Sequence, residues 1–209
     1  MSDWIGWVAA VVAAFFLGTV PFGLLLARAV AGVDIRKVGS GNIGATNVAR
    51  VLGLKGFLAT LLLDAGKGLA AVRLAPALVA GRAGDLSLPV ACAAAAVVGH
   101  CFPPFLRFRG GKGAATAAGA LLGLDAVAVG IAAGVWVVVL AVTRFASVAS
   151  IAMGLAFPLA VLVVEPREAL HERVPLLGLG CALAGFLLLR HRSNLRRLLA
   201  GTEPRVGRR

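Results

Sequence analysis

Long apolar runs separated by short polar and basic segments dominate this chain of 209 residues. The runs cover residues 4–28, 56–80, 87–106, 113–124, 126–142, 147–164 and 174–190. A helix that crosses a bilayer needs about 20 apolar residues, and only 113–124 falls well short of that length. The pattern predicts an all-α polytopic membrane protein with about seven transmembrane helices, one of them short. We expect one integral membrane domain over residues 1–209, with a mobile tail after residue 201.

Residues 113–142 leave two interpretations open, because their one charged residue, Asp125, lies near the middle. They form either one long tilted span or two shorter crossings that turn at Gly123-Leu124-Asp125. Seven crossings would put fifteen Lys and Arg residues in the loops and tail of one side. The other side would hold only Arg82, Arg167 and Arg173, beside Asp85, Glu165, Glu168 and Glu172. Basic loops stay cytoplasmic, so the distribution favours two crossings, an external N-terminus and a cytoplasmic C-terminus.

Composition supports the membrane prediction: 60% of the residues are hydrophobic, 14% are charged, and the mean hydropathy is +0.95. A soluble domain carries about 25% charged residues. The net charge of +12 lies in short runs without any tyrosine, which argues against a nucleic-acid partner. Three cysteines without CxxC spacing and three histidines without HExxH predict no metal site. The first apolar run is longer than a signal-peptide core and lacks a basic start, so we expect a retained span.

The first polar segment, residues 39–50, reads GSGNIGATNVAR and is more polar than a connector needs. Its glycines free the backbone to turn N–H groups toward an anion. Its side-chain donors are Ser40, Asn42, Thr46, Asn47 and Arg50, the last a planar fork suited to phosphate. The segment is either a phosphate-binding loop or a flexible loop that caps the next helix. The density of donors beside an arginine favours phosphate binding.

The second polar segment, residues 99–116, reads GHCFPPFLRFRGGKGAAT. Its run of Gly110, Gly111, Lys112 and Gly113 leads into an alanine-rich helix that contains Thr116. Helix N-termini favour a bound phosphate, and Lys112 would add a point charge. A Walker A loop requires glycine at position 106 and Ser or Thr at position 113, so nucleotide hydrolysis is not supported. A basic cytoplasmic turn is the alternative.

The third polar segment, residues 190–203, reads RHRSNLRRLLAGTE. On a continuing helix, His191 and Asn194 share a face. They belong either to a site or to a basic juxtamembrane helix, and we expect the arginines to bind anionic lipid. Arg144 and Ser147 form a weaker fourth segment on the same expected side.

Two charged residues, Asp64 and Lys67, fall three positions apart inside the second apolar run. Charges at membrane depth are candidates for a functional role. Each of the two has the other as a ready partner, so a structural ion pair fits equally well.

The strings GSGNIGATNVAR, LLLDAGKG, GHCFPPFLRFRGGKGAAT, TRFASVAS and HRSNLRRLLAGTE, in this order, resemble the bacterial acyl-phosphate:glycerol-3-phosphate acyltransferase family, PlsY. The resemblance covers nearly the whole chain. It implies acyl transfer from acyl phosphate to glycerol 3-phosphate, giving 1-acylglycerol 3-phosphate (lysophosphatidate) and phosphate. It also implies a place in phospholipid synthesis at the inner face of the plasma membrane, without a cofactor. The enzyme that produces acyl phosphate is a candidate partner.

The resemblance also suggests residue roles: an essential serine and arginine, a glycine-rich segment for glycerol 3-phosphate, and an important histidine, asparagine and glutamate. We expect catalytic roles for Ser40, Arg50, Lys112, His191 and Asn194. We expect substrate contacts from Asn42, Thr46, Asn47, Gly110, Gly111, Gly113, Thr116, Arg144 and Ser147. We expect structural roles for Glu203, Asp64 and Lys67. The chain departs from the family at Ser193, where glutamate is expected in many relatives, which removes a carboxylate role at this position.

The chemistry suits these residue types, because an acyl phosphate is an activated mixed anhydride and requires no acyl-enzyme. Holding two anions close together and stabilising the developing charge would suffice. The proton of the glycerol hydroxyl goes either to His191 or to the leaving phosphate, and we favour the phosphate, with His191 positioning the substrate. Acyl-CoA-dependent enzymes typically carry HxxxxD, which none of the three histidines begins. The alternative function is a small transporter or channel for phosphorylated anions.

Overall fold

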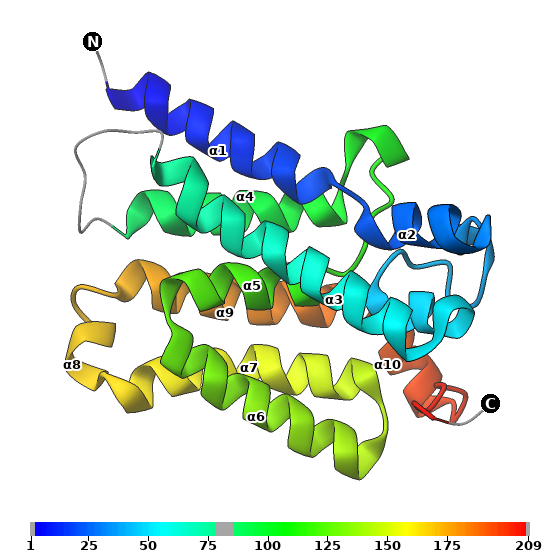
Figure 1. The fold of residues 1–209 in the computed structure, drawn as a ribbon. Helices are drawn as coiled ribbons and strands as arrows, with labels where there is room; N and C mark the ends of the chain where they lie inside the picture. Colours follow the sequence, from blue (N-terminus) through cyan, green and yellow to red (C-terminus); the bar gives the residue numbers. More distant parts are fainter. Residues whose placement is uncertain (1–2, 78–85, 208–209) are drawn as a thin grey trace. The chain divides into compact units, whose positions relative to one another are not determined.

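The computed structural model describes residues 3–77 and 86–207, and every regular element in these two stretches is a helix (Figure 1). The α-helices are α1 (Asp3–Thr19), α2 (Phe22–Ala31), α3 (Ala45–Ala77), α4 (Ser87–Cys101), α5 (Ala114–Leu124), α6 (Ala126–Thr143), α7 (Ala146–Val164), α8 (Pro166–Ala169), α9 (Val174–Arg190) and α10 (Arg192–Leu199). Two short 3-10 helices are η1 (Ile35–Lys37) and η2 (Pro104–Leu106). The predicted all-α fold is confirmed. Arg82 and Asp85 lie outside the described residues.

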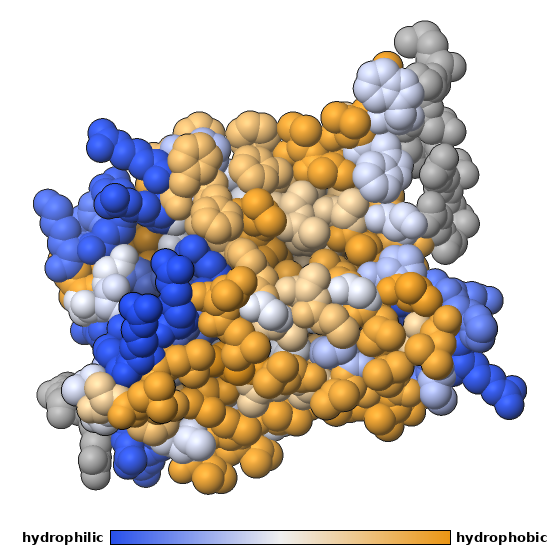
Figure 2. Space-filling model, turned by 180° about the vertical axis from the view of Figure 1, so that it is seen from behind, coloured by the Kyte–Doolittle hydropathy of each residue, from blue (hydrophilic) through white to orange (hydrophobic). Residues whose placement is uncertain are grey.

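Several helices have the length and apolar composition of membrane spans. Four helical segments meet both criteria among the described residues: Trp4–Ala31, Ser87–Leu106, Ala126–Thr143 and Ala146–Val164. A fifth is formed if α9 and α10 count as one bent span. Large apolar side chains such as Val142 and Val163, each 79% exposed, face outward. Figure 2 shows broad areas of hydrophobic surface, with hydrophilic residues gathered in separate areas. Such a surface requires lipid as its solvent.

The sequence predicts seven crossings, whereas only four or five segments among the described residues meet these criteria. The two helices that account for the difference are α3 and α5. Helix α3 carries Lys55, Asp64, Lys67 and Arg73, so it is less uniformly apolar than the others. Helix α5 has only 11 residues. The number of crossings and the orientation of the termini therefore stay predictions from the sequence.

Three helix breaks refine the predicted spans. The first apolar run is two helices, α1 and α2, because Pro21 lacks the N–H that a continuous helix would use. Residues 113–142 are also two helices rather than one, since Asp125 is extended (φ −152°) and its side chain accepts a hydrogen bond from the Ala128 N–H (2.8 Å). The prediction that one helix continues through His191 was wrong, because α9 and α10 meet there at a bend of 55°.

The chain forms two compact units, Met1–Leu124 (unit 1) and Asp125–Arg209 (unit 2). Within unit 1, α1 packs against α4, and α3 packs against α2 and α5. The approach of α3 to α5 depends on small residues, because a side chain on Gly119 would overlap the backbone of Ala65. Close contact through small residues is typical of helices that associate in lipid.

Within unit 2, α7 packs against both α6 and α9 (Figure 1). An ionic cluster joins Asp125, at the start of this unit, to the segment before α9. Arg173 Nη2 lies 3.0 Å from Asp125 Oδ2, and Arg173 Nη1 also pairs with Glu165. The cluster neutralises the charge of Asp125, which is 7% exposed and caps the N-terminus of α6.

Candidate active site

The loop between α2 and α3 takes its shape from one side chain, Asn47. This residue is 2% exposed. Its amide nitrogen lies within hydrogen-bonding distance of the carbonyl oxygens of Ile35 (3.1 Å), Val38 (2.9 Å) and Asn42 (2.9 Å). Its amide oxygen accepts from the Ser40 N–H (3.1 Å). Asn47 therefore organises the loop from inside, and its polar atoms are engaged in the protein rather than directed toward a substrate.

The other donors of this loop lie where a ligand could reach them. Ser40, Thr46 and Arg50 are exposed, and Arg50 Nη1 donates to the Asn47 amide oxygen (3.2 Å). Gly39 has a positive φ (57°), and a side chain there would run into the Arg50 guanidinium. Asn42 turns inward, since its side-chain oxygen accepts from the Gly44 N–H (2.9 Å). The loop thus presents Ser40 and Arg50 on a backbone held by Asn47.

The glycine-rich segment before α5 is fastened to the end of α4. The N–H groups of Gly110 and Gly111 donate to the carbonyl oxygens of Cys101 and His100 (both 3.1 Å). A side chain on Gly111 would overlap the His100 imidazole at Nε2, so glycine is required there. Gly113 has φ 85°, a conformation that L-residues rarely adopt.

The two remaining candidates of this segment differ in their exposure. Lys112 is partly buried at the start of α5, whereas Thr116 is fully buried beside Gly68 of α3. The Thr116 hydroxyl has no hydrogen-bond partner among the described residues. The ligand-binding role of Lys112 therefore stays a prediction, while Thr116 belongs to the packing of α5 on α3.

Asp64 and Lys67 form a buried ion pair in α3, with Lys67 Nζ 2.8 Å from Asp64 Oδ1. Lys67 also donates to the Val20 carbonyl (2.6 Å), at the break between α1 and α2. On the other side, His100 Nδ1 lies 3.6 Å from Asp64 Oδ1. The pair connects the α1–α2 break to the histidine beneath Gly111. This geometry favours the structural interpretation of Asp64 and Lys67 and adds His100, which the sequence reasoning did not single out.

Unit 2 contains a second polar centre, built around Glu203. Its Oε1 accepts from Ser147 Oγ and from Asn194 Nδ2, both at 2.7 Å. Its Oε2 accepts from Arg197 Nε at 2.8 Å. Burial raises the pKa of Glu203, but the bonds from Asn194, Ser147 and Arg197 outweigh it and hold the pKa below its usual value. Ser147 and Asn194 are thus oriented by one carboxylate.

His191 lies at the bend between α9 and α10 and is 3% exposed. Its Nδ1 lies 2.8 Å from the Leu187 carbonyl oxygen. Because a carbonyl oxygen only accepts, Nδ1 carries a proton, and when the ring is neutral Nε2 is its acceptor nitrogen. The Asn194 N–H donates to the His191 carbonyl (2.8 Å), so the bend keeps the two residues close together despite the broken helix.

Residues beyond Gly201 contact the segment between α6 and α7. The Val206 N–H donates to the Arg144 carbonyl (2.8 Å), and the Arg205 guanidinium lies 5.2 Å from the centre of the Phe145 ring. The Arg144 side chain is exposed, and its backbone is left-handed (φ 60°) where it ends α6. The segment expected to be mobile therefore has contacts as far as Val206.

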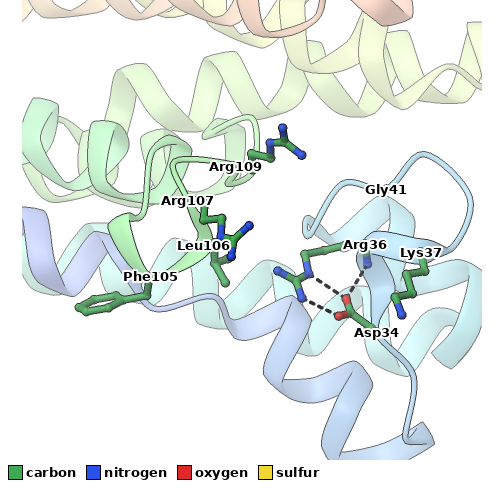
Figure 3. Close-up of a pocket in the computed structure, with 8 residues that line it drawn as sticks. All are labelled: Asp34, Arg36, Lys37, Gly41, Phe105, Leu106, Arg107 and Arg109. Atoms are coloured by element: carbon green, nitrogen blue, oxygen red, sulfur yellow. Dashed lines mark hydrogen bonds and ion pairs between the residues drawn. The ribbon is translucent and has the colours of Figure 1, made fainter.

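A basic pocket of about 620 Å³ in unit 1 was not foreseen from the sequence (Figure 3). Its walls are the segment after α2 and the loop after α4, which are separated by more than sixty residues in the chain. The lining residues are Asp34, Arg36, Lys37, Gly41, Phe105, Leu106, Arg107 and Arg109. No spacing motif links these two segments, so no local signal marked the pocket.

The fold and these loops define an integral membrane protein whose polar segments are suited to phosphate recognition. The family model described as "Glycerol-3-phosphate acyltransferase" matches residues 8–201. The glycerol-3-phosphate acyltransferase of Anaeromyxobacter sp. is 43% identical over 206 residues, covering 99% of both chains. That of Paramagnetospirillum magneticum is 47% identical over 205 residues, covering 96% of this chain and 94% of the relative.

Solved structures agree with these relatives. The crystal structure of PlsY, an integral membrane glycerol 3-phosphate acyltransferase, in its glycerol 3-phosphate form matches with a TM-score of 0.86 and 34% identity. The match covers 96% of each chain. The lysophosphatidic acid form matches with a TM-score of 0.84 and 33% identity, covering 96% of this chain and 95% of that one. The chain belongs to the glycerol-3-phosphate acyltransferase family of integral membrane enzymes, and the predicted resemblance is confirmed.

Proposed function

We propose that this protein transfers the acyl group of an acyl phosphate to glycerol 3-phosphate, releasing 1-acylglycerol 3-phosphate and inorganic phosphate. The observation that carries the proposal is the match, over nearly the full chain, to PlsY in a glycerol 3-phosphate form and a lysophosphatidic acid form. Those ligands are one substrate and one product of this reaction. The choice of donor is supported by the five motif strings and by the lack of HxxxxD in the sequence.

The proposed reaction is a single displacement at the acyl carbon. The glycerol hydroxyl oxygen forms a bond to the carbonyl carbon, and the bond from that carbon to the phosphate oxygen breaks. The hydroxyl proton passes to the departing phosphate, so the atoms and charges balance without an acyl-enzyme. The protein then has to position two anions and stabilise the charge on the carbonyl oxygen.

In unit 1, we assign phosphate binding to Arg50 and Lys112, with Ser40 as a neutral donor. Arg50 is exposed on a loop whose shape Asn47 fixes, so its guanidinium can meet phosphate without reorganising the backbone. Asn42 and Asn47 support this loop rather than contact substrate, since their side chains bond within it. Gly110, Gly111 and Gly113 shape the backbone that presents Lys112.

In unit 2, we assign the glycerol hydroxyl to His191 and Asn194. The Nδ1 contact with Leu187 favours the tautomer in which Nε2 is an acceptor, and in the proposed complex this nitrogen accepts a hydrogen bond from the hydroxyl. Ser147 supports this pair through Glu203. In this role His191 positions the nucleophile, and His191→Ala should raise the KM for glycerol 3-phosphate about tenfold more than it lowers kcat. A lost kcat with unchanged affinities for both substrates would instead identify His191 as the general base.

We also propose that the reaction takes place at the cytoplasmic face of the plasma membrane. The support is the distribution of Lys and Arg along the sequence, fifteen against three between the expected sides. Single cysteines introduced at Lys55 and at Arg192, both exposed, should react with an impermeant thiol reagent only in inverted membrane vesicles. Labelling of either position from outside intact cells would contradict this orientation.

The decisive experiment uses the purified full chain in liposomes of neutral phosphatidylcholine. Acyl phosphate and glycerol 3-phosphate should give lysophosphatidate and inorganic phosphate in equal amounts, and Arg50→Ala should form both at least about 100-fold more slowly. Uptake of glycerol 3-phosphate into the vesicles without any lysophosphatidate would overturn the proposal in favour of a transporter.

A further inference from the structure

The basic pocket shown in Figure 3 carries more positive charge than its acidic residue can neutralise. Four basic side chains, Arg36, Lys37, Arg107 and Arg109, line it together with one acid, Asp34. Asp34 is already engaged, since its Oδ2 pairs with Arg36 (2.6 Å) and with Arg28 (2.9 Å). Hydrogen bonds from Arg36 and then Arg28 hold the pKa of Asp34 well below its usual range. Asp34 is therefore ionised at neutral pH, and its charge is already paired with Arg36 and Arg28.

The other three cations have no acidic partner in the part of the chain that the structure describes. Neither Lys37, Arg107 nor Arg109 forms an ion pair with any described carboxylate. All three side chains are exposed, and they reach the same pocket from two separate segments. Basic residues are common in cytoplasmic loops, where they set the orientation of the protein in the membrane, but that role does not require them to line a shared pocket. The arrangement is suited to a ligand with two negative charges.

The loop after α4 adopts an unfavourable backbone to present its two arginines. Arg107 (φ 52°) and Phe108 (φ 60°) are consecutive non-glycine residues in the left-handed region. Hydrogen bonds from the Arg107 and Phe108 N–H groups to the carbonyls of Pro104 (2.9 Å) and Pro103 (3.0 Å) hold this turn. Bulky residues rarely adopt φ > 0, and such strain concentrates at functional sites. Glycine would adopt the same backbone conformation without strain. The presence of Arg107 and Phe108 instead indicates that their side chains have a role.

The same loop joins the pocket to an apolar surface. Leu106 packs against an apolar cluster that includes Ile35, Ile43 and Val48, and this contact joins the two walls of the pocket. Next to it, Phe105 is 75% exposed, and its ring centre lies 6.4 Å from that of Phe16 on α1. Phe16 is itself 50% exposed on a helix of membrane-spanning composition. The surface therefore runs from unpaired cations, past Leu106 and Phe105, to a face of α1 suited to lipid.

We propose that this pocket is a second phosphate site, which binds the terminal phosphate group of a long-chain lipid phosphate while the chain lies along Phe105 and Phe16. Both the donor and the product of the proposed function belong to this class of ligand, and the inference rests on that function for the choice of class. The site differs from the phosphate-binding residues assigned in unit 1 under the proposed function, because neither Arg50 nor Lys112 lines the pocket. A ligand without a chain, such as glycerol 3-phosphate, would gain nothing from the apolar side.

The test is equilibrium binding to the full chain in nanodiscs of neutral phosphatidylcholine, with four probes. Two carry a chain: a long-chain alkyl phosphonate, which stands in for the acyl phosphate and cannot react, and lysophosphatidate. Two lack a chain: inorganic phosphate and glycerol 3-phosphate. The pocket variant is Arg107→Asn with Arg109→Gln, since asparagine tolerates the left-handed backbone at position 107. The control, Lys55→Gln with Arg167→Gln, removes the same charge from exposed residues outside the pocket.

The pocket variant should bind at least one of the two long-chain probes about tenfold more weakly, as expected for two lost charge-assisted hydrogen bonds. The control should change binding by less than about twofold. Weakening confined to the phosphonate would identify the donor as the ligand, and weakening confined to lysophosphatidate would identify the product. If the double variant shifts the unfolding temperature, Arg109→Gln alone carries the test, with about threefold weaker binding expected.

Two results would overturn the site: unchanged binding of both long-chain probes, or equal weakening of all four probes. Because the readout is binding without turnover, it remains informative if acyl phosphate proves not to be the donor. In that case the proposed function fails while the pocket still binds its ligand.

Discussion

Units 1 and 2 each contain a polar centre organised by one buried side chain, but the two side chains act in different ways. In unit 1, Asn47 bonds mainly to backbone groups, at Ile35, Val38, Ser40 and Asn42. In unit 2, Glu203 bonds to three side chains, those of Ser147, Asn194 and Arg197.

The difference shows that one buried group determines the backbone path of a loop, whereas the other determines the orientation of neighbouring side chains. An amide that satisfies backbone carbonyls fixes the path of the chain, whatever side chains that path carries, and it does not titrate. A carboxylate that collects side-chain donors fixes the orientation of those donors, and its strength depends on its charge. We therefore expect that loss of Asn47 would disorder the α2–α3 loop of unit 1, and that loss of the Glu203 charge would misorient Asn194 in unit 2.

The largest effect is expected for Asn47→Leu, which leaves three carbonyls and the Ser40 N–H without their partner. Buried groups that lose hydrogen bonds cost about 1–3 kcal/mol each, and partial exposure to water would reduce the total to about 2–4 kcal/mol. Thermal unfolding in detergent, followed by circular dichroism, should shift down by several degrees, and activity should disappear. An unchanged unfolding temperature would show that the loop does not depend on Asn47.

Arg50→Ala should separate function from stability in the same loop. Arg50 is exposed, and among the described residues its one hydrogen bond goes to Asn47 at 3.2 Å, so its removal should leave the unfolding temperature within about one degree. Loss of a charged phosphate contact should lower kcat/KM about 100-fold or more. Arg50→Lys is the matched control, and it should recover only part of the rate because an ammonium cannot form the planar fork. Full activity in Arg50→Ala would remove this residue from the site.

Glu203→Gln tests the charged centre of unit 2, with a smaller loss expected. Glutamine keeps an acceptor for one donor but loses the ion pair with Arg197, and it turns an N–H₂ group toward Ser147 or Asn194. We expect kcat/KM to fall about tenfold with a modest drop in unfolding temperature. Ser193→Gln, at an exposed position on α10, the helix that carries Asn194 and Arg197, is the control and should leave both quantities unchanged.

The pH dependence of stability should distinguish the two centres. Since the folded-state pKa of Glu203 lies below its usual value of about 4.5, its contribution is complete above that value and is lost as the pH falls through the lowered pKa. Unfolding temperatures measured from neutral pH to below pH 4 should therefore fall more steeply for the wild type than for Glu203→Gln. Parallel curves would show that Glu203 does not hold unit 2 through its charge.

The smallest effect concerns the basic pocket. Asp34→Asn removes the one acid of the pocket and should bind the long-chain phosphonate two- to threefold more tightly, because Arg36 becomes available to the ligand. High salt should erase the difference. Weaker binding in this variant would show that Asp34 is needed to position Arg36.

Much of the fold was predictable because it depends on local properties of the sequence. Apolar runs without charge can only be helices in lipid, and Asp125 after Gly123 gave a local signal for the break before α6. The bend at His191 carried no such signal, since the residues around it have no proline or glycine that would end a helix. Only the observed backbone shows that α9 ends there.

The candidate site was predictable as a set of motifs but not as an arrangement. Asn47 resembled a ligand donor because its partners, the carbonyls of Ile35 and Val38, leave no trace in the side-chain sequence. The link from Asp64 to His100 and Gly111 joins three segments, which no single spacing encodes. The basic pocket combines residues near positions 36 and 108 for the same reason. The roles given to Ser40, Lys112, His191 and Asn194 stay predictions until variants are measured.

The identity of the acyl donor tests the account most directly. The purified full chain would receive glycerol 3-phosphate together with equal amounts of acyl phosphate and acyl-CoA that carry acyl chains of different length. Mass spectrometry of the lysophosphatidate then shows which chain was transferred. The account predicts product with only the chain of the acyl phosphate, matched by an equal amount of inorganic phosphate. Product with the chain of the acyl-CoA would contradict it.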